Sequence, residues 1–417
     1  MVIIFFLIGQ WVTVGIDTIL VNSNAKYLTM QSLVLDSFNT LHAIWHERVG
    51  NYYQLFYSYK KPDSTWSSPL LLAETANPNG VIAVTPNGKV HIAYTSPIVA
   101  RNELYYLTNH YGNFIKIRIT NDTLWDYSPT IAFRDSFVHI VWIKSLEGSG
   151  YKLYYLWGLP HNFQIVQLRN SQLGDFGLGA APYLTISPEG ICHVSYRGGN
   201  YPEYHIHHAE NSFLGDTNFS YEVLTTINLY DYHSAIYAQA NGELFLSVSG
   251  DNGFGSRKRT CYLYRPPNSR EWQPYQLMTD TNSAEIRSLF VKNNKVHITW
   301  ERINGNLRTQ MIYHCSNFTN NWLNSEVLAD GRSQSGSLII DNQNMGYLLI
   351  AHQDGSNYQL LCLKSRPFVG IAERQDQRKL RKIVNLKKKK VDKFFYDITG
   401  KKVRNLKRGI YFENPFY

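Results

Sequence analysis

The sequence predicts an all-β chain in which four-stranded sheets repeat radially, and three observations predict it. The phrase VHIVW (138–142) has close copies in LHAIW, VHIAY, CHVSY and VHITW. Weaker copies are LFLSV and YLLIA, and successive copies lie 48 to 54 residues apart. Aromatic residues, which favour strands, make up 14% of the chain. A period near fifty that occurs seven times indicates an array of supersecondary units. The second position of the phrase is occupied by His42, His91, His139, His193, Phe245, His297 and Leu348.

Each unit contains the same four predicted strands. A short apolar run such as VIAVT (81–85) is followed by a tight polar turn such as TPNGK (85–89) or SPEG (187–190), where glycine adopts a positive φ without strain. The repeated phrase is the second strand, and a tyrosine-rich segment is the third. An aromatic residue opens the fourth: Trp66, Phe114, Phe163, Phe219, Trp272 and Trp322. Four antiparallel strands per unit, repeated radially, predict a seven-bladed β-propeller.

The two ends of the repeat region are expected to close the ring. No aromatic-led fourth strand follows YQLLCLK in the seventh unit, whereas an unpaired strand-like segment, IDTILVNSN (16–24), precedes the first. We therefore expect residues 16–24 to pair with the strand at Tyr358–Lys364. Such pairing removes the exposed edge of an open ring.

The repeated histidines have a structural interpretation. We expect each ring to lie between adjacent sheets with its N–H bonded to backbone, so that the five histidines cannot meet at one site. His205 and His207 of HIHH share a strand face and are expected to be surface residues. The four cysteines form no CxxC pair and are expected to be buried thiols. The sequence thus predicts no metal site and no cofactor.

The basic charge is concentrated in the tail. Residues 366–417 contain 16 basic and 5 acidic residues, a net charge of +11, whereas residues 1–365 contain 25 and 27, a net charge of −2. Because the body is nearly neutral, we expect no nucleic-acid partner. At the other end, the apolar stretch at 1–15 is too short to span a bilayer comfortably and is typical of a signal peptide, although a buried first strand is an alternative. No other segment predicts a transmembrane helix.

Two resemblances follow from these patterns. The blade pattern over residues 16–365 resembles secreted bacterial propellers of the sialidase-like, BNR-repeat superfamily. Residues 391–417, with YDITG (396–400), KKVRNL (401–406) and GIYF (409–412), resemble the small β module that sorts cargo of type IX secretion, and residues 366–390 form a basic linker before it. These resemblances imply a secreted or cell-surface protein that the secretion machinery recognises through its tail. We expect a monomer.

Candidate ligand-binding residues come from one face of the predicted ring. Loops after the second strands and loops between blades emerge on the same face. They carry carboxylates, arginines and aromatic rings, which suit sugars or uronates. The candidates are Glu47, Arg48, Asp126, Tyr127, Arg197, Tyr232, His233, Glu301 and Arg302.

Two functions remain open at this level, and no catalytic residue is assigned. One is a non-catalytic propeller that binds carbohydrate or another extracellular polymer. The other is a polysaccharide-degrading enzyme at the propeller mouth. A glycoside hydrolase would need two carboxylates, such as Glu47 and Glu301. A uronate lyase would need a base and a neutralising cation, for which Tyr232, His233 and Arg197 are the candidates. The sequence favours the binding function, because no catalytic motif stands out from the repeat.

Overall fold

The structure is a computed structural model of the chain. It describes residues 11–23, 25–27, 32–75, 77–98, 101–146, 150–168, 181–200, 203–224, 230–239, 241–251, 259–274, 276–277, 284–292, 295–304, 309–316, 326–329, 333–354, 357–368, 395–396, 402–403 and 412–413. Two compact units make up the chain, residues 1–368 and residues 369–417.

Antiparallel sheets form the first unit. The opening sheet contains β2 (Ala25–Tyr27), β3 (Leu33–Leu35), β4 (Leu41–Val49), β5 (Tyr52–Lys60) and β6 (Leu70–Thr75). The next contains β7 (Val81–Val84), β8 (Val90–Ile98), β9 (Arg101–Thr108) and β10 (Ile115–Arg118). The third contains β11 (Asp126–Arg134), β12 (Phe137–Ser145), β13 (Tyr151–Leu159) and β14 (Asn162–Gln167). The fourth contains β15 (Tyr183–Ile186), β16 (Cys192–Asn200), β17 (Glu203–Glu210) and β18 (Ser220–Val223).

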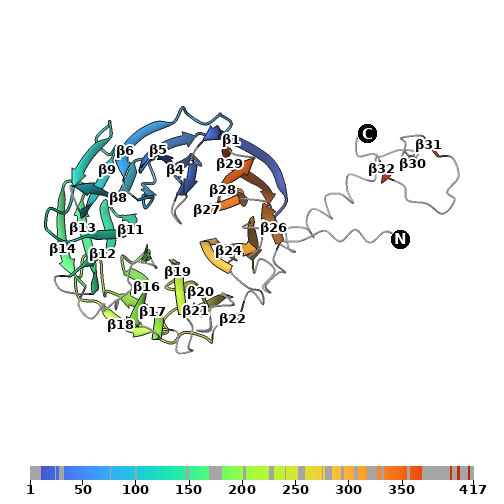
Figure 1. Cartoon of the computed structure of the whole chain (residues 1–417). Helices are drawn as coiled ribbons and strands as arrows, with labels where there is room; N and C mark the ends of the chain where they lie inside the picture. The colour runs from blue at the N-terminus through green and yellow to red at the C-terminus, as the bar shows by residue number, and fades with distance from the viewer. Residues whose placement is uncertain are drawn as a thin grey trace. The chain divides into compact units, whose positions relative to one another are not determined.

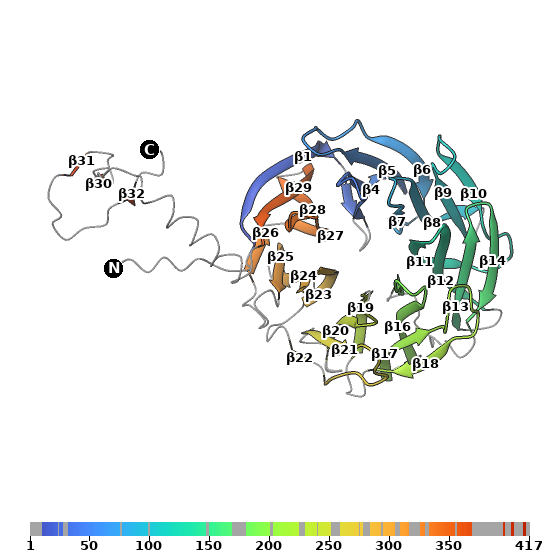
Figure 2. The same cartoon turned by 180° about the vertical axis from the view of Figure 1, so that it is seen from behind.

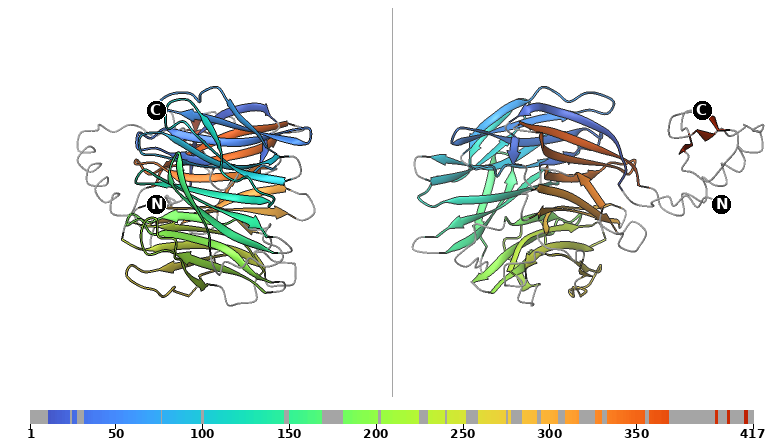
Figure 3. Two further views of the ribbon diagram at one scale, coloured as in Figure 1. Left: turned by 90° about the vertical axis from the view of Figure 1, so that its left-hand side faces the viewer. Right: turned by 45° about the vertical axis from the view of Figure 1, so that its right-hand side comes forward.

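The remaining sheets complete the ring shown in Figures 1 and 2. One contains β19 (Tyr230–Ala238), β20 (Leu244–Asp251), β21 (Arg259–Arg265) and β22 (Gln276–Leu277). Another contains β23 (Ala284–Lys292), β24 (Lys295–Asn304), β25 (Thr309–Ser316) and β26 (Glu326–Ala329). The last contains β27 (Ser333–Ile340), β28 (Met345–Asp354), β29 (Asn357–Pro367) and β1 (Thr13–Ser23). The side views in Figure 3 show the strands of the blades stacked around the ring.

The fold is an all-β propeller, and the described residues contain no helix. The prediction of seven four-stranded blades is wrong in its count: six blades have four antiparallel strands, not seven, because the opening sheet has five. In this sheet the place of the innermost strand is shared by β2 and β3, which pair with opposite ends of β4. Inner strands of other blades have register shifts in the same region, as between Tyr127 and Thr130.

The predicted ring closure is confirmed by the strand register. β1 pairs antiparallel with β29, with Ile16 opposite Leu363 and Ser23 opposite Tyr358. The pairing begins at Thr13, before the expected start at residue 16. Trp11 is only 6% exposed and belongs to the same apolar cluster as Phe368. Residues 1–10 of the expected signal peptide lie outside the described residues.

Packing between neighbouring blades explains the repeated phrase. Its fifth position points into the core, where Trp45 and Trp142 are fully buried and Trp300 is 2% exposed. One core cluster joins Val141 of β12 to Val194 of β16 in the next blade. Each second strand is covered on both sides, so it needs similar side chains in every blade.

The turns after the inner strands repeat as well. A side-chain oxygen of Asp36, Thr85, Ser187 or Asp341 accepts the backbone N–H four residues later at 2.8 to 3.2 Å. Gly88 and Gly190 have φ values of 80° and 86°, as the Asn-Gly and Glu-Gly pairs predict. We call this side of the ring the turn face. The opposite side, where β4, β12, β16 and β24 end and β11, β19 and β23 begin, is the mouth face.

The repeated histidines are buried as expected, but three of them bond to a tyrosine instead of backbone. The Nδ1 atom of His42 lies 2.8 Å from the hydroxyl of Tyr57, and that of His139 lies 2.7 Å from the hydroxyl of Tyr155. His91 and Tyr106 form the same pair. Each tyrosine belongs to the third strand of the same blade. The expectation of a backbone partner is therefore wrong for these three rings.

The second unit contains β30 (Phe395–Tyr396), β31 (Lys402–Val403) and β32 (Phe412–Glu413) in the order β31-β30-β32. These strands fall within or beside the three segments predicted as strands. The expected linker at 366–390 differs from the structure at its start, because Phe368 still belongs to the first unit. Within the described residues no helix is long and apolar enough to cross a membrane.

Candidate functional site

The nine sequence-predicted residues all belong to strands that begin or end at the mouth face. Asp126 opposes Lys144 where β11 meets β12, and His233 opposes Ser249 where β19 meets β20. Glu47 and Arg48 lie near the end of β4, and Arg197, Glu301 and Arg302 lie toward the ends of their second strands. The side chains of Tyr232 and Arg302 fall outside the described residues. The strands thus bring the candidates to one face, and the seven whose side chains are described do not form one cluster.

Asp126 is an interior anchor of this face. The side chain is fully buried. Its Oδ1 accepts the indole N–H of Trp142 at 2.7 Å and lies 3.2 Å from Lys144 Nζ, while its Oδ2 accepts the hydroxyl of Thr120 at 2.5 Å. Burial raises the carboxyl pKa, and the bonds from Thr120 and Lys144 offset only part of that rise. Asp126 therefore supports the surface and is not itself exposed to a ligand.

Lys144 connects this interior anchor to solvent. Its ammonium lies 2.6 Å from Asp122, whose side chain is 46% exposed, and 5.6 Å from the ring centroid of Tyr154. Burial alone would lower the pKa of Lys144, but Asp122 and Asp126 outweigh burial and raise it. The lysine is held as a cation between a buried and an exposed carboxylate.

An aromatic platform lies at the start of β11, on the opposite face of the sheet from Asp126 and Lys144, because strand side chains alternate. Trp125 is 40% exposed and stacks on Tyr127 with a centroid distance of 6.0 Å and an interplanar angle of 5°. Tyr151 contacts Tyr127 edge to face at 6.1 Å. Two bonds to Ser145 fix the backbone of Trp125: its N–H donates to Ser145 Oγ at 2.8 Å, and its carbonyl accepts from Ser145 N–H at 2.9 Å. The indole is therefore presented to solvent from a fixed backbone.

Arg197 lies on the neighbouring blade and is mostly buried. It is 6% exposed, and its guanidinium carbon lies 4.6 Å from the ring centroid of Tyr204. The core that joins these two blades also includes Tyr127 and Tyr151 as packed neighbours. Arg197 alternates along β16 with Tyr196 of that core, so its side chain is on the other face of the sheet, where it makes the cation–π contact with Tyr204.

The predicted carboxylates have different environments. Glu301 is 1% exposed and forms an ion pair with Arg287. Glu47 is half-buried and accepts the indole N–H of Trp45 at 3.0 Å. Arg48 is exposed and donates from Nε to the carbonyl of Gly50 at 3.1 Å. Among these three groups, the exposed Arg48 is the one that a polymer could reach directly.

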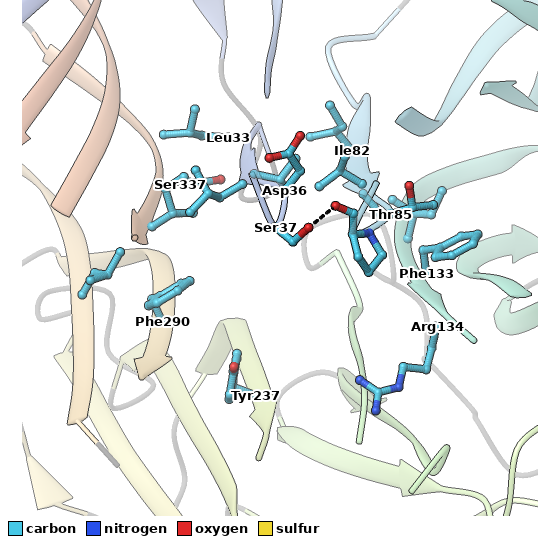
Figure 4. A pocket seen from close by; sticks show the side chains of 18 of the residues that line it. Leu33, Asp36, Ser37, Ile82, Thr85, Phe133, Arg134, Tyr237, Phe290 and Ser337 are labelled. Carbon is cyan, nitrogen blue, oxygen red and sulfur yellow. Dashed lines mark hydrogen bonds between the residues drawn. The ribbon is translucent and has the colours of Figure 1, made fainter. Parts of the chain in front are cut away.

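A cavity of about 1070 Å³ lies along the inner strands, and the sequence did not indicate its lining. Figure 4 shows Phe133, Tyr237 and Phe290 around it, with the Arg134 side chain nearby. Arg134 donates from Nη2 to the carbonyl of Pro188 at 3.0 Å. None of the nine predicted residues is among those that line this cavity. The cavity and the mouth-face platform are therefore different surfaces.

The comparisons with known proteins concern the fold. No protein-family model matches the chain, and no curated protein matches it. Its solved structural neighbours include the phage phi92 endosialidase, with a TM-score of 0.50 and 10% identity over 97% of this chain and 75% of that chain. They also include an alpha-L-arabinanase of Penicillium chrysogenum (TM-score 0.48, 9% identity, 85% and 98% covered) and an Aleuria aurantia lectin (TM-score 0.44, 9% identity, 74% and 97% covered). The chain is an all-β propeller whose structural neighbours include glycan-active enzymes and a lectin.

Proposed function

We propose that this propeller binds a carbohydrate polymer at its mouth face, with Trp125 as the stacking residue. The observation that carries this proposal is the exposed indole of Trp125, whose backbone is fixed by two bonds to Ser145. The hydrophobic face of a sugar ring packs on an indole, while its hydroxyls need charged or polar partners at the edge.

The platform suits binding because little of it must be ordered when a ligand arrives. Tyr127 supports the indole from behind, and both backbone bonds of Trp125 to Ser145 are already formed. A pre-positioned ring avoids part of the entropy cost of fixing a side chain on binding. The half-exposed Asp122 carboxylate, three residues before Trp125 in the loop that leads into β11, offers sugar hydroxyls an acceptor at the mouth face.

The surroundings of the predicted carboxylates favour binding over catalysis. Asp126 and Glu301 are buried and held by Lys144 and Arg287, respectively. A glycosidase acid must reach the glycosidic oxygen, and its nucleophile or base must reach the anomeric carbon or a water beside it. Neither Asp126 nor Glu301 is placed to reach such a bond. The experiment below tests the alternative function, a polysaccharide-degrading enzyme, together with binding.

The test begins with a polysaccharide array and continues with the affinity for the strongest ligand. Trp125→Ala is expected to weaken that affinity about five-fold or more, which corresponds to about 1 kcal/mol of lost stacking. Phe213→Ala is the matched control, because Phe213 is an aromatic residue that is 62% exposed on the turn face. Equal affinities for the wild type and Trp125→Ala would place the ligand elsewhere. Release of reducing ends or unsaturated uronates from the bound polymer would show the enzymatic alternative.

We also propose that the protein functions outside the cell, as the resemblances at both ends imply. The residues that carry these resemblances lie largely outside the described part of the chain. Deletion of residues 369–417 should retain the protein inside a host that has the type IX machinery. Unchanged export of the deletion variant would contradict the proposal.

A further inference from the structure

The partner of His193 differs from that of His42, His91 and His139. In the blade β15–β18, the third-strand position held elsewhere by Tyr57, Tyr106 and Tyr155 is occupied by His208. The Nδ1 atom of His193 lies 3.3 Å from the Nε2 atom of His208, and the two rings stack at 5.4 Å with an angle of 12°. The substitution places two imidazole nitrogens where three other blades have one imidazole and one phenol.

A carboxylate completes a three-sided group. His208 and Glu210 share one face of β17 because strand side chains alternate. The Oε2 atom of Glu210 lies 3.3 Å from His193 Nδ1 and 4.0 Å from His208 Nε2. Tetrahedral zinc with bonds of about 2.0–2.1 Å holds its ligand atoms about 3.3 Å apart. These three atoms are therefore separated almost as three corners of a zinc tetrahedron.

The other nitrogen of His208 is oriented by a carboxylate. Its Nδ1–H donates to Glu222 Oε1 at 2.7 Å, so that the Nε2 lone pair is directed toward the group. The same oxygen accepts the indole N–H of Trp272, from the next blade, at 2.8 Å. A histidine that binds a metal through one nitrogen commonly donates its other N–H to a carboxylate, which fixes the tautomer and raises the basicity of the ligand.

The charge of the group is compatible with a divalent cation. Burial lowers the pKa of His193 to about 4, so this ring is neutral at pH 7. Hydrogen bonds from His193 and Arg265 outweigh the effect of burial and hold the pKa of Glu210 below its usual range. Arg265 lies 2.6 Å from Glu210 and 3.8 Å from Glu222. Around the two rings, the carboxylates of Glu210 and Glu222 and the guanidinium of Arg265 together carry a net charge of −1.

We propose that His193 Nδ1, His208 Nε2 and Glu210 Oε2 bind one Zn²⁺ ion near the turn face, between the blades β15–β18 and β19–β22. Both histidine side chains are at least 96% buried, whereas that of Glu210 is 24% exposed. A water molecule as the fourth ligand would enter on the glutamate side. Arg265 keeps its contact with Glu210, since a carboxylate oxygen has a second lone pair. The ion would fasten β16 to β17 close to the Trp272 contact, and the site differs from the HIHH pair that the sequence drew attention to, His205 and His207.

The experiment measures Zn²⁺ binding to the untagged, full-length protein by isothermal titration calorimetry and by metal analysis after dialysis. The wild type should bind one Zn²⁺ per chain and unfold at a higher temperature with the ion. His208→Tyr should lose this binding, and Glu222→Gln should weaken it about 10- to 100-fold. His161→Gln changes an exposed histidine and should bind zinc as the wild type does.

His208→Tyr also separates loss of the site from loss of the fold. It recreates the histidine–tyrosine pair of three other blades, so without metal it should retain the wild-type circular dichroism spectrum. Absence of Zn²⁺ binding in the wild type would overturn the proposal and leave the group as a hydrogen-bond network. Undiminished zinc affinity in a folded His208→Tyr would overturn it as well.

Discussion

The buried histidines of the repeat predict that the propeller loses stability on mild acidification. His139 is fully buried with its Nδ1 atom 2.7 Å from the Tyr155 hydroxyl, and its buried Nε2 has no hydrogen-bond partner among the described residues. Burial lowers the pKa of His139 from 6.5 to about 3. The unfolded chain takes up a proton near pH 6.5, whereas the folded ring does not. The contribution of His139 to the free energy of unfolding is therefore complete above pH 6.5 and is lost as the pH falls toward 3.

The size of the effect follows from the difference in pKa. A pH of 5 is about 1.5 units below the pKa of the histidine ring in the unfolded chain. Protonation of the unfolded chain therefore lowers the free energy of unfolding by about 2 kcal/mol for each such histidine. Burial also lowers the pKa values of His46 and His91 to about 3, with repulsion from His110 adding to the effect at His91. Three histidines together remove about 6 kcal/mol at pH 5. This loss is comparable with the whole stability of many domains, about 5–15 kcal/mol.

The assay is urea unfolding, followed by tryptophan fluorescence, at intervals from pH 8 to pH 5. His139→Phe should show about 2 kcal/mol less loss between these limits than the wild type, whatever its stability at pH 8. His161→Gln removes an exposed histidine and should show the wild-type loss. If His139→Phe and the wild type have the same pH dependence, His139 does not remain neutral in the folded protein and the reasoning fails.

Two further predictions concern the interior anchor and the boundary of the propeller. Asp126→Ala should reduce the free energy of unfolding by about 3–5 kcal/mol, because it leaves the buried ammonium of Lys144 without its interior carboxylate. Asp122→Ala, at an exposed carboxylate, should cost about 1 kcal/mol or less, and equal losses in urea unfolding would contradict this account. Deletion of residues 369–417 should leave the melting temperature of the propeller unchanged, whereas Phe368→Ala should cost about 3–5 kcal/mol because this ring is 2% exposed. Unfolding of the propeller on deletion of the tail would show that the two units are cooperative.

The sequence predicted the ring because the repeat is itself a packing requirement. The aromatic residue that ends five of the seven copies of the phrase, such as Trp45 or Trp142, fills a gap between neighbouring sheets, and Val248 and Ala351 are the buried residues at that position in the other two. Closure by the N-terminal strand was also predictable, because the seventh unit lacked a fourth strand and the segment at 16–24 was a strand that belonged to no unit. The five-stranded opening sheet was not predictable, because the division between β2 and β3 has no counterpart in the pattern of the phrase.

The sequence by itself also determined which strand ends meet at the mouth face, since alternating strand direction fixes which loops share a side. Only the tertiary structure decided what those residues do. Asp126 and Glu301 are charged and adjoin loops, yet both are buried in ion pairs, whereas Trp125 is exposed and fixed. Likewise, the pairing of His193 with His208 depends on strand register across fifteen residues. Burial and side-chain partners arise from contacts between strands and blades, so a pattern along one strand determines the face of a residue but not its neighbour.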